Sequence, residues 1–158
     1  MEKANNIEDF VRGVADGLGI GCSVRYDLKT LSYGEVYQYQ LDEYGEYVDM
    51  DELPNDIEDE LKDWELDVVK YLREIRDLPD EIEPPRTWKQ IDWMADFANE
   101  RSKDPRFVKD VQRAIDSRHP FGAFKDVMAD YGLLEDWYQY CGECYQDYVR
   151  SEIDLDEL

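Results

Sequence analysis

The stretch DIEDELKDWELDVVKYLREIRD, residues 56–77, decides the fold class because its periodicity is the strongest secondary-structure signal in the chain. Its apolar residues recur at helical spacing and fall within about 100° of one another on a helical wheel. These residues are Ile57, Leu61, Trp64, Val68, Tyr71, Leu72 and Ile75. The stretch therefore predicts a long amphipathic helix that begins after Pro54.

One side of this predicted helix is strongly acidic. With Ile57 at 0°, the wheel between about 200° and 300° carries six acids and a single base, Lys70. The opposite side mixes acids with bases at i,i+4 spacing, such as Glu58 and Lys62. We call the acidic side the acidic edge, and its members are Asp59, Glu60, Asp63, Asp67, Glu74 and Asp77.

The residues before this helix predict a short helix and a β-hairpin. Asn5 or Asn6 can cap a first helix, and glycines should end it. Alternating residues 24–28 and 36–41 predict two strands, joined by residues 29–34. A third strand near residues 46–48 would complete a small antiparallel sheet with one face on the helices. The glycines of the helix stop are Gly17, Gly19 and Gly21.

Prolines and capping residues divide the rest of the chain into further helices. Thr87 and Gln90 have the spacing of a capping box, and Asp104 precedes a proline that suits the first helical turn. Pro120 opens another helix, and Gly132 separates it from the last one. We expect tryptophans of the predicted helices to anchor the core: Trp64, Trp93 or Trp88, and Trp137.

These elements predict a helix-dominated α+β fold with about five or six helices and an N-terminal antiparallel hairpin or small sheet. At 158 residues, without an internal repeat, the chain is expected to form a single domain over 1–158. The acidic tail, about residues 151–158, is expected to be flexible.

The charge of the chain limits its partners. Net charge is −22, and residues 42–83 hold 18 acids and four bases. Such a field repels nucleic-acid phosphates and anionic membranes but attracts basic surfaces. We therefore expect a basic protein surface as partner, such as that of a nucleic-acid-binding protein, and neither direct nucleic-acid binding nor membrane binding.

Cysteine and histidine, which often act as nucleophiles or metal ligands, are few in this chain. Cys141 and Cys144 have metal-like spacing, but Cys22 and His119 are the only further zinc ligands of the usual type. We predict no catalytic residue, no metal and no cofactor, with Cys141 in the core. The three cysteines and the absence of a signal-peptide pattern favour a reducing, cytoplasmic location.

An ordered set of short motifs resembles the bacterial uncharacterised protein family 0158, strongest over residues 84–149. The resemblance implies a fold but no activity. The family tends to show a glycine- and arginine-rich turn around residues 117–123, where this chain has Ser117, His119 and Pro120. The motifs are Tyr26-Asp27-Leu28, Gly34-Glu35-Val36, Pro84-Pro85, Met94 to Phe97, Ala114-Ile115-Asp116, Arg118, Phe121, Phe124-Lys125-Asp126 and Leu133 to Tyr138.

From these observations we expect a non-catalytic interaction protein of bacterial or phage origin that binds a basic partner through the acidic edge. The edge has one net charge per roughly 5 Å at 1.5 Å rise per residue, against one per about 1.7 Å in duplex DNA. Imitation of nucleic acid would therefore also need the acidic segments 42–55 and 78–83. The alternative is a metal-dependent hydrolase built on carboxylates, which would need convergent acids in a pocket.

Overall fold

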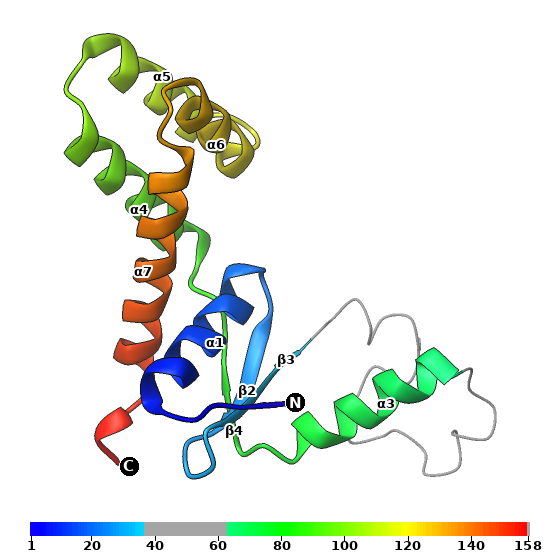
Figure 1. The fold of residues 1–158 in the computed structure, drawn as a ribbon. Coiled ribbons are helices and arrows are strands. Elements are labelled where there is room, and N and C mark those ends of the chain that lie inside the picture. Colours follow the sequence, from blue (N-terminus) through cyan, green and yellow to red (C-terminus); the bar gives the residue numbers. More distant parts are fainter. Residues whose placement is uncertain (37–62, 158) are drawn as a thin grey trace. The chain divides into compact units, whose positions relative to one another are not determined.

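The computed structural model describes residues 1–36 and 63–157, with side chains from Asp67 onward in the helix that begins at Asp63. These residues form six α-helices and one four-stranded sheet (Figure 1), which confirms the predicted helix-dominated α+β fold. The predicted strand near residues 46–48 lies outside the described residues. No helix in the described part is long and apolar enough to span a membrane.

The chain divides into two compact units. Unit 1 holds residues 1–84 and 146–158, and unit 2 holds residues 85–145. The prediction of a single domain stays a prediction, because the division describes contacts and not independent folding.

Unit 1 is built around the sheet, whose strand order is β1-β3-β2-β4 with every neighbouring pair antiparallel. Its elements are β1 (Glu2–Lys3), α1 (Ile7–Gly19), β2 (Ser23–Asp27), β3 (Ser32–Val36), α3 (Asp63–Arg76) and β4 (Asp80–Ile82). Asn6 caps α1 by accepting a hydrogen bond from the Asp9 amide at 2.8 Å, as its sequence predicts.

Helices cover both faces of this sheet, whereas the sequence predicted helices on one face. The Tyr33 ring lies 6.0 Å from that of Phe10 in α1. A Cβ on the adjacent Gly34 would instead lie 2.5 Å from Ile75 Cγ2 in α3. Because successive strand residues point to opposite faces, α1 and α3 pack on opposite sides of the sheet. The prediction of a single covered face was wrong because a single sequence does not show that α3 packs closely against the strand at Gly34.

Hydrogen bonds join α3 and the residues that follow it to one face of the sheet. Arg25 in β2 donates from Nη2 to the Leu78 carbonyl oxygen at 2.6 Å and from Nε at 3.2 Å. The Tyr71 hydroxyl donates to the Glu35 carbonyl oxygen at 2.7 Å. The buried face of α3 includes Val69, which the wheel had left outside its apolar stripe.

One boundary prediction in unit 1 was wrong, and one strand was not predicted. The second hairpin strand begins at Ser32 rather than at residue 36, because the turn is short and Leu31 adopts a left-handed φ of 56°. Helix α1 ends at Gly19, among the glycines predicted to stop it, and Gly21 follows with a φ of 90°. Strand β4 was not predicted, since its three residues are too few to show alternation.

Unit 2 is helical. It comprises α4 (Thr87–Arg101), α5 (Pro105–Ile115), α6 (Pro120–Asp130) and α7 (Leu134–Glu152) as far as Tyr145. The Asp104 carboxylate accepts a hydrogen bond from the Arg106 amide at 3.0 Å, which confirms the predicted start of α5.

The predicted capping box at Thr87 was wrong. Arg86 is the N-cap of α4 without a side-chain bond, while Gln90 donates to the Pro85 carbonyl oxygen at 2.9 Å.

Aromatic side chains form the core of unit 2. Trp137 is 5% exposed, and its ring lies 4.9 Å from Phe124 and 5.5 Å from Phe97, as expected for an anchor. Trp93 is half-buried beside Tyr145. Trp88 is 62% exposed, so of the two alternatives it is Trp93 that packs against the core. The side chain of Trp64 is outside the described set. The buried residues of α4 are Met94, Phe97 and Ala98.

The C-terminal segment begins with regular structure. Helix α7 extends through Glu152, and the short 3-10 helix η4 spans Leu155–Glu157. Between them, Ile153 is 2% exposed. The flexibility expected from about residue 151 stays a prediction.

Candidate functional site

The acidic edge predicted on α3 lies partly within the described residues. Asp59 and Glu60 are outside them, and Asp63 begins α3 with a side chain that is not described. The remaining three members are exposed, as the wheel predicts: Asp67, Glu74 and Asp77.

Positive groups lie beside the acids in the described part of the acidic edge. Glu74 Oε2 lies 3.7 Å from the amino group of Met1, and Asp77 Oδ1 lies 3.8 Å from Arg76 Nε. Lys70 is exposed on the same side of the helix. Along this side of α3 the exposed charges therefore alternate in sign, with negative, positive and negative groups at residues 67, 70 and 74.

The excess negative charge belongs almost entirely to one unit. Unit 1 holds 29 acids and nine bases, so its net charge is −20. Unit 2 holds 11 acids and nine bases, which leaves a net charge of −2. The chain is thus one strongly acidic unit joined to one nearly neutral unit.

Within unit 2, α5 carries a basic surface that the sequence analysis missed. Arg106, Lys109 and Arg113 are all exposed and recur at i, i+3 and i+7, within about 60° on a helical wheel. We call these three residues the basic ridge. The spacing of the three bases was the sequence signal for the ridge, but only the packing of α5 shows that all three are exposed.

Among the described residues, the acids next to the ridge accept hydrogen bonds, whereas the ridge bases form no ion pair. Asp110 accepts a hydrogen bond from the Tyr131 hydroxyl at 2.8 Å, and Asp116 accepts one from Gln112 Nε2 at 3.0 Å. The Asp110 contact raises the pKa of Tyr131 because the carboxylate favours the protonated phenol. In the part of the chain that the structure describes, no ridge base forms an ion pair within 4.0 Å.

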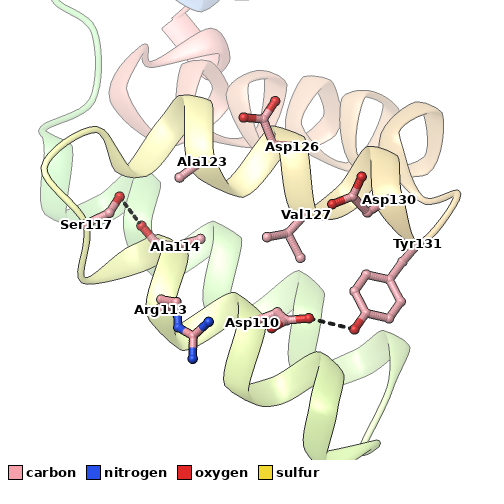
Figure 2. Close-up of a pocket in the computed structure, with 9 residues that line it drawn as sticks. All are labelled: Asp110, Arg113, Ala114, Ser117, Ala123, Asp126, Val127, Asp130 and Tyr131. Carbon is pink, nitrogen blue, oxygen red and sulfur yellow. Dashed lines mark hydrogen bonds between the residues drawn. The ribbon is translucent and has the colours of Figure 1, made fainter.

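A groove of about 380 Å³ lies beside the ridge, between α5 and α6 (Figure 2). Ala114, Ala123 and Val127 provide its apolar lining, and Arg113 borders it. Figure 2 shows Tyr131 and Asp110 meeting at one end, while Asp126 and Asp130 project from α6 and do not converge with them. The groove is therefore not a convergent carboxylate pocket.

The thiols and the histidine do not assemble into a centre. Cys141 is half-buried, and burial raises its pKa, with a smaller opposing effect from Lys125. His119 is exposed in the turn before α6. Among the described residues, no group of three or more His, Cys, Asp and Glu side chains could hold a metal ion.

Fold and surface together define an acidic, helix-dominated α+β protein with two compact units and a basic ridge on the less charged one. The chain belongs to the uncharacterised protein family UPF0158, which it matches over residues 30–155, and the predicted resemblance is confirmed. It is 32% identical over 78 residues to UPF0158 protein PA5073 of Pseudomonas aeruginosa. That match covers 49% of this chain and 50% of the relative, so the chain spans about half the length of the curated relative it matches. No solved structure matches the chain.

Proposed function

We propose that this protein is a non-catalytic interaction protein whose acidic unit 1 binds a basic surface on a protein partner. The observation that carries the proposal is the separation of charge, −20 in unit 1 against −2 in unit 2. Solubility requires only interspersed charge, whereas a concentrated field attracts a basic surface from within about one Debye length, 8 to 10 Å.

The acidic edge of α3 is the proposed docking surface of unit 1. Asp67 and Glu74 are exposed, while Leu72 and Ile75 on the other side of the helix are fully buried. Substitutions at the edge can therefore change its charge without removing core contacts. Imitation of nucleic acid or inhibition of a nucleic-acid-binding protein would be one form of this function.

Charge reversal of the edge tests the proposal. We expect Asp63→Lys, Asp67→Lys and Glu74→Lys together to preserve the fold but slow partner association, because surface charge steers the encounter. Affinity capture from the host, at low and high salt, would measure the partners retained. Basic proteins should be lost from the variant, and the salt sensitivity of capture should fall with them.

The matched control reverses three exposed acids of unit 2, Asp92→Lys, Glu100→Lys and Glu143→Lys, which changes the net charge equally. It should retain the partners. If both variants lose them equally, net charge rather than the edge is responsible. If the edge variant captures the same basic proteins with unchanged salt sensitivity, the edge is a solvated surface and the proposal fails.

The carboxylate-based hydrolase stays the competing hypothesis. It requires acids that converge in a pocket, and the groove between α5 and α6 does not favour it because its carboxylates lie apart.

A further inference from the structure

The basic ridge is an exposed positive surface on a chain of net charge −22. Residues 101–118 hold six bases and three acids. The buried face of α5 consists of Phe107, Val111 and Ala114, and the ridge lies on the other side of the helix. Burial of the core therefore does not account for the ridge, and its charges are available to an anionic surface.

The charge order along this side of α5 is complementary to that along α3. Read backwards from Arg113 within α5, the groups at residues 113, 110 and 106 are positive, negative and positive. The groups at residues 67, 70 and 74 of α3 are negative, positive and negative. Both series use intervals of three and four residues, so they match when the two helices run antiparallel.

Distances along the helices agree with this register. Asp67 and Glu74 are seven residues apart, as are Arg113 and Arg106, which corresponds to about 10.5 Å of helix in both cases. The antiparallel register brings together three pairs of opposite charge. The pairs are Asp67 with Arg113, Lys70 with Asp110, and Glu74 with Arg106.

We propose that the protein self-associates through this antiparallel contact, with α3 of one copy against the basic ridge on α5 of a second copy. This inference rests on the proposed function, since it names a second copy as the carrier of the basic surface. A second copy matches the alternating signs, including the pair of Lys70 with Asp110. A phosphate backbone presents only negative charge, so it would repel the Asp110 carboxylate that stands between Arg106 and Arg113 in the sequence of α5.

Such a contact should be weak at high salt and stronger at low salt. Exposed ion pairs contribute little singly and are screened by counterions. Sedimentation equilibrium of the full chain at about 20 mM and about 0.5 M sodium chloride, where the Debye length differs several-fold, measures this directly. We expect a mass above 18.8 kDa at low salt that returns to 18.8 kDa at high salt.

A charge exchange tests the register. The basic-edge variant carries Asp67→Lys and Glu74→Arg, and the acidic-ridge variant carries Arg106→Glu and Arg113→Asp. Each alone places like charges together and should weaken self-association by about tenfold or more. An equimolar mixture should associate again, because each variant then offers the surface that the other lost. Arg86→Glu with Arg118→Glu makes the same charge change away from the ridge and should associate like the parent.

The outcomes separate this inference from the proposed function. A parent that stays at 18.8 kDa at all salt concentrations overturns self-association, while capture of basic partners by the edge would still support the proposed function. Loss of association in only one of the two variants, or no recovery in the mixture, overturns the register. Ridge-dependent binding of a DNA duplex by the monomeric parent would identify nucleic acid as the occupant instead. Circular dichroism of each variant confirms that it is folded.

Discussion

At the level of single residues, the neighbourhood of Cys141 explains why a metal-like spacing need not imply reactivity. The side chain packs against the aromatic core of unit 2 and is half-buried. Removing a thiolate from water costs free energy, so burial raises the pKa of Cys141, and Lys125 offsets only part of that effect. Cys141 therefore behaves as a small core side chain.

We predict that Cys141 reacts slowly with alkylating reagents at neutral pH. A raised pKa lowers the thiolate fraction below that of an ordinary thiol, and the thiolate is the nucleophile. With Cys22→Ser and Cys144→Ser in place, the alkylation rate should still be rising with pH above the ordinary value of 9.0. Mass spectrometry follows the reaction. The same variant in urea is the control and should react faster, and equal rates in both states would contradict the assignment.

Among the elements, α7 shows how a helix can carry aromatic residues of different roles. Trp137 is almost fully buried between Phe97 and Phe124, whereas the next residue, Tyr138, is 52% exposed. Lys125 of α6 lies 5.9 Å from the centre of the Tyr138 ring. The buried ring stabilises unit 2, while the exposed one remains in contact with solvent.

We predict that Trp137→Ala lowers the free energy of unfolding by about 3 to 5 kcal/mol, because the substitution leaves a large cavity in a packed core. Trp88→Ala is the matched control, since that side chain is 62% exposed and should change stability by less than about 0.5 kcal/mol. Urea unfolding measures both variants. Equal losses would show that burial does not separate the two tryptophans.

For the whole molecule, separation of charge is the dominant physical property. Unit 1 combines a small sheet and its covering helices with 29 acids and nine bases. Like charges at this density repel one another and destabilise the folded state. The buried core of unit 1, including Phe10, Leu18 and Leu72, must offset that repulsion.

We predict that salt raises the melting temperature. Counterions screen the repulsion, so the transition should move upward by several degrees between about 20 mM and about 0.5 M sodium chloride. Differential scanning calorimetry at low protein concentration limits the contribution of self-association. Potassium chloride should act equally, because the effect is screening rather than binding of a particular cation. A transition that does not move with either salt would mean that repulsion is not significant.

Local sequence was sufficient for most of the helical architecture. Asp104 before a proline and Asn6 before an apolar run identify helix starts, because a cap satisfies amides only two or three residues away. Gly132, with a φ of 71°, likewise separates two helices as predicted. Trp137 could be assigned to the core because it belongs to a clear apolar stripe.

Contacts between distant residues were not predictable in the same way. Strand β4 pairs with β2, which places Ile82 opposite Val24, and three residues are too few to reveal that partnership. Gly34 was interpreted as part of a turn, whereas it allows α3 to approach the sheet. The basic ridge was overlooked because its significance depends on which α5 side chains are exposed.

The sequence by itself determined the fold class, the starts of α1, α5 and α6, the family and the net charge of −22, because these depend on composition and on short-range spacing. Only the tertiary structure decided which face of each helix is buried, and therefore which charges reach solvent together. It placed helices on both faces of the sheet and left Asp67, Glu74 and the basic ridge exposed. The reason is that burial is a property of packing between segments far apart in the chain, which no local pattern encodes.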